Sequence, residues 1–90
     1  VLVNDGSLTL IKATQQRRYA ERYIAVDLHN PDFGVLARAF GVRYGLAHAD
    51  AEFEAALRDA LAGDEPYLLE VRPGDARTYR PGEALGLNVY

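Results

Sequence analysis

Three short apolar segments, separated by residues with helical spacing, constrain the fold of this chain most. They are residues 1–3, 42–47 and 67–71. The first is continuously apolar and the last is mostly apolar, which is typical of strands covered on both faces, as in a parallel sheet. Helical periodicity is strongest in one apolar stripe: Phe53, Ala56, Leu57, Ala60 and Leu61. The order strand, helix, helix, strand, helix, strand predicts an α/β fold, a parallel sheet with flanking helices joined by right-handed crossovers.

Turn and cap residues set the expected helix boundaries. Ser7 is a candidate N-cap for a first helix over residues 7–18, because its hydroxyl can accept a hydrogen bond from a helix N–H. Asn30 is a candidate N-cap for a second helix, with Pro31 at its first position. Gly41 is expected to end that helix, since the position after a helix favours a positive φ.

Two segments lack clear periodicity. Residues 24–26 fit either a short strand or an extended linker. Residues 73–90 are punctuated by Gly and Pro and are interpreted as a C-terminal tail that follows a domain over residues 1–72. Val1-Leu2-Val3 is interpreted as the end of a buried strand, and three strands make a small sheet. We therefore expect the domain to be truncated at its N-terminus.

Composition narrows the class of protein. Ninety residues suit one small domain, and a net charge of −3 argues against a nucleic-acid partner. No apolar run reaches about 18 residues, so no membrane partner is expected. The absence of cysteine excludes disulfides and fits a cytoplasmic protein. Residues 1–23 carry a net charge of +2, which suits an anionic ligand, an acidic neighbouring subunit or a solvated helix face.

The turn Asn4-Asp5-Gly6-Ser7 stands between the first apolar segment and the first expected helix. Open α/β sheets bind ligands outside the carboxyl ends of their strands, which is where this turn lies. Taken alone, the same composition is also a common turn.

Residues 1–8, residues 27–41 and residues 66–71 together resemble a known family. The first reads Val-Leu-Val-Asn-Asp-Gly-Ser-Leu, the second contains Asn30-Pro31-Asp32-Phe33, and the third reads Pro-Tyr-Leu-Leu-Glu-Val. The chain resembles the C-terminal half of the diphosphate-binding domain of thiamine-diphosphate enzymes, in the acetolactate synthase and 2-keto-acid decarboxylase group. The Gly-Asp-Gly half of that family's signature is absent here. Val3-Asn4 stands where the family often has Asn-Asn.

The resemblance implies a site for thiamine diphosphate and Mg²⁺ at the turn. Asn4 through its side-chain oxygen and Gly6 through its carbonyl are the implied metal ligands, and both suit Mg²⁺, which prefers oxygen. The other ligands would be an absent Asp, diphosphate oxygens and water. Ser7 and Leu8 are implied to offer backbone N–H groups to the diphosphate at a helix start. Thr9 is the remaining implied cofactor contact.

The resemblance also implies an enzyme, a lyase or transferase that decarboxylates a 2-keto acid and joins the product to an acceptor. Leu10 and Ile11 would line the substrate pocket. Decarboxylase relatives carry a proton-relaying Glu at the position aligned with Leu10, so the aliphatic residue favours carboligation. The catalytic Glu of the family lies on a different domain of a neighbouring subunit. We therefore expect no catalytic residue in residues 1–90, a homodimer or homotetramer, and an inactive isolated fragment.

Two other functions are kept open. One is a non-catalytic α/β interaction module that docks through its basic N-terminal helix. The other is a different phosphate-binding α/β domain, although neither a G-x-G-x-x-G nor a Walker pattern is present. His29 and His48 have no evident partners, so we expect both to be structural or solvated.

Overall fold

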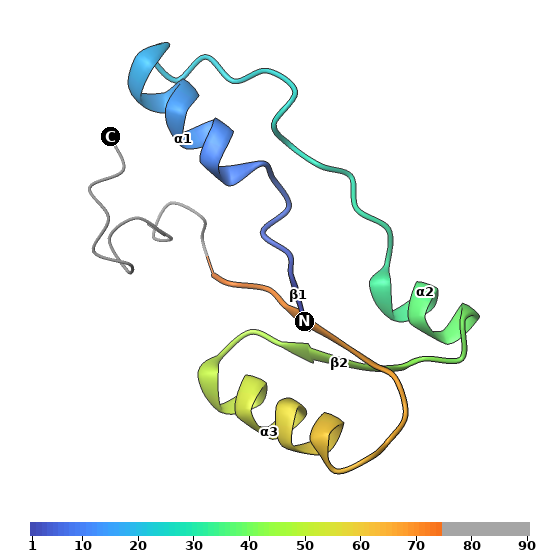
Figure 1. The fold of residues 1–90 in the computed structure, drawn as a ribbon. Helices are drawn as coiled ribbons and strands as arrows, with labels where there is room; N and C mark the ends of the chain where they lie inside the picture. Colours follow the sequence, from blue (N-terminus) through green and yellow to red (C-terminus); the bar gives the residue numbers. More distant parts are fainter. Residues whose placement is uncertain (75–90) are drawn as a thin grey trace.

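The computed structural model of the chain describes residues 1–74. Its elements alternate in the predicted order, which is confirmed (Figure 1). They are β1 (Leu2–Val3), α1 (Thr9–Arg18), α2 (Phe33–Ala39), β2 (Arg43–Ala47), α3 (Asp50–Leu61) and β3 (Tyr67–Val71). The expected C-terminal tail lies almost wholly outside the described residues.

The three strands form one parallel sheet in the order β1-β3-β2, which confirms the predicted α/β class. Leu2 pairs with Glu70 on one side of β3, and Leu46 pairs with Glu70 on the other. Because β3 is central, Leu69 and Glu70 are buried. The middle of β3 is therefore the part of the sheet that water reaches least.

The helices cover both faces of the sheet. The chain moves two positions from β1 to β2 and then back one position to β3, so right-handed crossovers place the connecting helices on opposite faces. Figure 1 shows α2 and α3 on opposite sides of the strands. The α3 stripe packs on β2 and β3 as expected at four of its five positions, whereas Leu61 stays exposed. The half-buried members are Phe53, Ala56, Leu57 and Ala60.

Helix α1 and the segment that returns from it extend away from the sheet (Figure 1). No residue of α1 is buried. Residues 24–26 form neither a regular strand nor a fully extended linker, because Ala25 bends the chain at a positive φ of 55°. Next to them, Asp27 makes an isolated antiparallel bridge to Ser7. The return segment thus runs back beside the turn that precedes α1.

Two predicted caps are wrong. Helix α1 begins at Thr9 with Leu8 as its N-cap, because the Ser7 N–H and hydroxyl are engaged within the turn. Helix α2 is capped by Asp32, whose carboxylate accepts a hydrogen bond from the Val35 N–H at 2.8 Å. The predicted end of α2 is confirmed, with Gly41 at a φ of 67°.

The prediction of a buried first strand is also wrong. Strand β1 pairs with β3 on one side only, so Val1 and Val3 remain exposed and Leu2 is half-buried. In residues 1–74, no helix has the length and apolar character needed to cross a membrane.

Candidate functional site

The turn at residues 4–7 continues directly from the carboxyl end of β1. The Asn4 N–H donates to the Val71 carbonyl at 2.8 Å, which ties the start of the turn to β3. Gly6 adopts a positive φ of 71°, a conformation that glycine adopts without steric cost. A Cβ placed on Gly6 would meet no atom within 4 Å, so this side of the turn is open.

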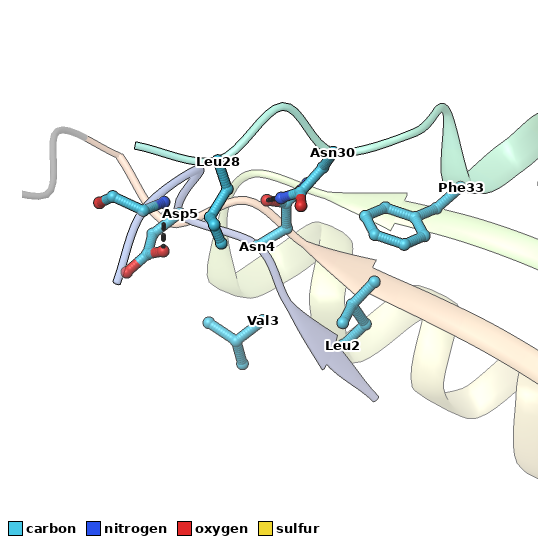
Figure 2. A pocket seen from close by; sticks show the side chains of 8 residues that line it. Leu2, Val3, Asn4, Asp5, Leu28, Asn30 and Phe33 are labelled. Atoms are coloured by element: carbon cyan, nitrogen blue, oxygen red, sulfur yellow. Dashed lines mark hydrogen bonds between the residues drawn. The ribbon is translucent and has the colours of Figure 1, made fainter. Parts of the chain in front are cut away.

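Asn4 is held by hydrogen bonds at both ends of its amide. Its Nδ2 donates to Glu70 Oε1 at 2.7 Å. Its Oδ1 accepts from the Gly6 N–H at 3.1 Å and from Asn30 Nδ2 at 2.7 Å. Figure 2 shows the Asn30 side chain reaching toward Asn4 from the segment before α2. The amide oxygen therefore faces the turn, and the NH₂ group faces the sheet.

Glu70 is fully buried, yet the pKa of its carboxyl group is lowered rather than raised. Burial alone would raise the pKa of Glu70, but hydrogen bonds from Arg72, Tyr44 and Asn4 outweigh it and lower the pKa to about 2. Arg72 Nε donates to Oε1 at 2.7 Å, and the Tyr44 hydroxyl donates to Oε2 at 2.5 Å. Burial and the bond to Glu70 together raise the pKa of Tyr44 to about 12.

The next residues use their polar groups within the turn. The Ser7 N–H donates to Asp5 Oδ1 at 3.1 Å, and the Leu8 N–H donates to the Val26 carbonyl at 2.7 Å. The Thr9 hydroxyl donates to the other oxygen of Asp5, so the Ser7 hydroxyl, 3.1 Å from Thr9 Oγ1, is left to donate to Thr9. The N–H groups expected to contact a diphosphate at Ser7 and Leu8 thus already have acceptors.

The N–H groups at the start of α1 are placed differently. The first backbone bond of this helix runs from the Lys12 N–H to the Leu8 carbonyl at 2.9 Å. The amides of Thr9, Leu10 and Ile11 precede it and have no acceptor within the helix. They are the donors that the fold leaves for an anion at this end of α1.

A cavity of about 170 Å³ opens beside the turn (Figure 2). Its wall includes β1, the turn, the segment before α2 and the first residue of α2: Leu2, Val3, Asn4, Asp5, Ser7, Leu28, Asn30 and Phe33. The two residues expected to line a substrate pocket, Leu10 and Ile11, are not part of this wall. Both are more than half exposed on α1. The described residues therefore bring the predicted metal ligand Asn4 to the cavity, but neither Gly6 nor the predicted substrate contacts.

The donor set at the turn fits a hard divalent cation in part. Asn4 Oδ1 is an amide oxygen, and the Gly6 carbonyl, which accepts from the Leu28 N–H at 2.8 Å, keeps a second lone pair. A cation can bind Asn4 Oδ1 only if the Asn30 side chain moves away from this oxygen. Asn30 is exposed, so its side chain has solvent to move into. Within residues 1–74, no three His, Cys, Asp or Glu side chains gather into a metal site. The Asp5 carboxylate in the cavity wall already accepts hydrogen bonds from the Ser7 N–H and the Thr9 hydroxyl.

This arrangement coincides with a family match over residues 1–71. The matching family is described as thiamine pyrophosphate enzyme, C-terminal TPP binding domain. The chain belongs to this family. The match runs from β1 through β3 and so includes the turn, the cavity wall and Glu70.

Curated relatives in this TPP-binding family are acetolactate synthase large subunits. The chain is 40% identical over 72 residues to the acetolactate synthase isozyme 2 large subunit of Escherichia coli K12, which covers 79% of this chain and 13% of that protein. It is 29% identical over 91 residues to a probable acetolactate synthase large subunit of Methanococcus aeolicus, which covers 98% of this chain and 15% of that protein. The chain therefore spans about a seventh of the length of these relatives.

The sequence reasoning missed the residues that support Asn4. Glu70 stands in an otherwise apolar strand, and this charged residue in a central strand was the signal that could have revealed it. Arg72 follows two positions later and so lies on the same face of the chain. Asn30 was interpreted only as a helix cap, and Tyr44 only as part of the expected strand over residues 42–47.

Proposed function

We propose that this TPP-binding domain belongs to a thiamine-diphosphate- and Mg²⁺-dependent enzyme that decarboxylates a 2-keto acid and joins the product to an acceptor, as in acetolactate synthases. The family match over residues 1–71 supports the cofactor, and the relatives' names support the activity. The single observation in the structure that carries the proposal is the Asn4 amide, whose oxygen faces the open turn.

Each site residue that the family resemblance implied has a role in this proposal. Asn4 Oδ1 and the Gly6 carbonyl hold Mg²⁺, which prefers oxygen ligands shared with a diphosphate. Thr9 places the first free amide of α1 toward the diphosphate, and Ser7 and Leu8 shape the turn that leads to it. Leu10 and Ile11 face the substrate from the exposed side of α1.

The cofactor supplies the carbon chemistry by stabilising negative charge on the substrate carbon after CO₂ is lost. This chain anchors the diphosphate end of the cofactor and thereby orients it. The remaining ligand carboxylate, the activating Glu and the rest of the substrate pocket come from the rest of the polypeptide and from a neighbouring subunit of a homodimer or homotetramer. We place the enzyme in the cytoplasm.

Calorimetry on the full-length apoenzyme tests this proposal. Thiamine diphosphate is titrated with and without Mg²⁺ into the wild type and into Asn4→Ala. We expect Asn4→Ala to weaken Mg²⁺-dependent binding at least about tenfold, because ordered groups at a metal site are commonly worth 10–100-fold in metal affinity. An unchanged affinity in Asn4→Ala would contradict the proposal.

Asn30→Ala is the matched amide variant for this experiment. Asn30 donates to Asn4 Oδ1, so its amide competes with a cation for the same oxygen. We expect its removal to leave Mg²⁺-dependent affinity equal to that of the wild type or tighter. A loss as large as that of Asn4→Ala would show that general damage to the turn, rather than loss of a ligand, explains the weaker binding.

A further inference from the structure

Glu70 is a buried charged residue in an otherwise apolar strand, so apolar packing does not explain its position. It is 0% exposed and lies between Leu2 of β1 and Leu46 of β2 in the register of the sheet. A buried carboxylate is costly unless charged or polar partners satisfy it. Glu70 has three such partners, and one of them is Asn4. The strand end is thus built around this carboxylate.

The two oxygens of Glu70 serve different neighbours. Oε2 accepts from the Tyr44 hydroxyl. The Tyr44 ring packs closely on Gly34, since a Cβ on Gly34 would lie 3.0 Å from it. Oε1 accepts from Arg72 Nε and from Asn4 Nδ2, both at 2.7 Å. Asn4, Tyr44 and Arg72 all donate to this carboxylate, so it accommodates the NH₂ end of the Asn4 amide and not its oxygen.

We propose that Glu70 is the positioning residue for Asn4, and that its carboxylate makes the Asn4 amide present oxygen rather than nitrogen to the divalent cation at the turn. This inference rests on the proposed function, because it concerns the same metal ligand. Without an acceptor on β3, only the longer bond from the Gly6 N–H and the bond from the exposed Asn30 amide would favour one of the two minima of the terminal torsion of Asn4. In one of them the NH₂ group, which cannot bind Mg²⁺, faces the turn.

A purely structural role for Glu70 makes a different prediction. In that case the carboxylate only satisfies Tyr44 and Arg72, and any loss of metal affinity follows the loss of fold stability. Tyr44→Phe separates the two roles, because it removes the hydrogen bond to Oε2 and leaves the bond from Asn4 to Oε1.

The experiment uses the full-length apoenzyme at saturating thiamine diphosphate and measures the dissociation constant of Mg²⁺ by calorimetry. We expect Glu70→Met to raise this constant about tenfold or more, in the range known for groups that orient metal ligands. Glu70→Gln should stay within about threefold of the wild type, because its oxygen can accept from Asn4 and Arg72 while its NH₂ group donates to the Tyr44 hydroxyl. Tyr44→Phe should also stay within about threefold, because it loses one hydrogen bond remote from Asn4.

Two outcomes overturn the inference. One is a wild-type Mg²⁺ dissociation constant in a folded Glu70→Met variant. The other is a loss in Tyr44→Phe as large as that in Glu70→Met, since the loss would then follow the stability of the fold. Thermal unfolding of each metal-free variant shows whether it is folded.

If Glu70→Met does not fold, a second pair of variants tests the inference. Asn4→Asp sets two carboxylates against each other, whereas Asn4→Asp/Glu70→Gln again places one NH₂ donor opposite one carboxylate. We expect the double variant to bind Mg²⁺ about ten times more tightly than Asn4→Asp, as for other coupled neighbours. Equal affinities in the two variants overturn the inference.

The results also separate this inference from the proposed function. If the wild type shows no Mg²⁺-dependent binding of thiamine diphosphate, both fall together. If the wild type binds, Asn4→Ala loses binding and Glu70→Met does not, the proposed function stands and the role of Glu70 is refuted.

Discussion

Two regions of the molecule are stabilised in different ways. They are the α1 arm, defined as residues 9–28, and the sheet region, defined as residues 33–71. In the sheet region α3 turns its apolar stripe onto β2 and β3. In the α1 arm Leu10 is 58% and Ile11 is 51% exposed, and no residue of α1 is buried. One helix is held by apolar burial, and the other is not.

Val26 is the buried apolar residue of the α1 arm, and polar contacts hold the helix itself and the rest of the return segment. Lys12 pairs with Asp27 at 2.6 Å, and its ammonium group lies 5.4 Å from the centre of the Tyr23 ring. Gln15 bonds the backbone of Ile24 twice, through Nε2 to the carbonyl and through Oε1 from the N–H, each at 3.1 Å. Exposed contacts of this kind contribute about 1 kcal/mol or less each. The comparison teaches that stability is concentrated in the sheet region, while the proposed cofactor turn joins it to the weaker arm.

Truncation of the core should have the largest effect. Leu69 is 2% exposed in the central strand, so we expect Leu69→Ala to lower the free energy of unfolding by about 2–5 kcal/mol. Urea denaturation measures the change. Leu10→Ala is the matched control in the α1 arm and should change the free energy by less than about 0.5 kcal/mol. Equal effects of the two substitutions would abolish the distinction between the regions.

Acid should weaken the sheet region through Glu70. Its pKa in the folded protein, about 2, lies below its ordinary value of 4.5, so its contribution to stability is present above about pH 4.5 and is lost as the pH falls toward 2. The total is on the order of 3 kcal/mol. Tyr44, Arg72 and Asn4 face this carboxylate, and Asp32 also acts on Tyr44.

Denaturation series between pH 6 and pH 2 on the wild type and Glu70→Gln measure the contribution of Glu70 to the free energy of unfolding. The other carboxyl groups titrate in both proteins, so the difference between the two curves isolates Glu70. We expect the stability advantage of the wild type to shrink as the pH falls. A difference that stays constant over this range would show that Glu70 does not have a depressed pKa.

Loss of the Gln15 contacts should have the smallest effect. Gln15→Ala removes the acceptor of the Ile24 N–H, and we expect that amide to exchange its hydrogen about fivefold faster because a typical hydrogen bond contributes about 1 kcal/mol. Hydrogen exchange followed by NMR measures it. The Leu69 amide should not change, and Gln16→Ala on the exposed side of the same helix is the control. Faster exchange at Leu69 would mean that the arm and the sheet open together.

Much of the fold could be predicted from the sequence because its signals are local. The spacing from Phe53 to Leu61 and the short apolar segments specify elements by their own periodicity, and Gly41 ends α2 because only its own φ matters. The predicted caps at Ser7 and Asn30 failed because both side chains have alternative partners. A cap depends on this competition, which residue type alone does not reveal.

The candidate site likewise has one part that the sequence predicts and one part that depends on the tertiary structure. The sequence by itself determined that a polar turn with a flexible glycine follows the first strand, and it singled out Asn4 and Gly6. Only the tertiary structure decided which way the Asn4 amide faces, because its partner Glu70 lies 66 positions away and reaches it through the pairing of β1 with β3. The turn is therefore a local feature of the sequence, whereas the orientation of its ligand oxygen is a consequence of strand order.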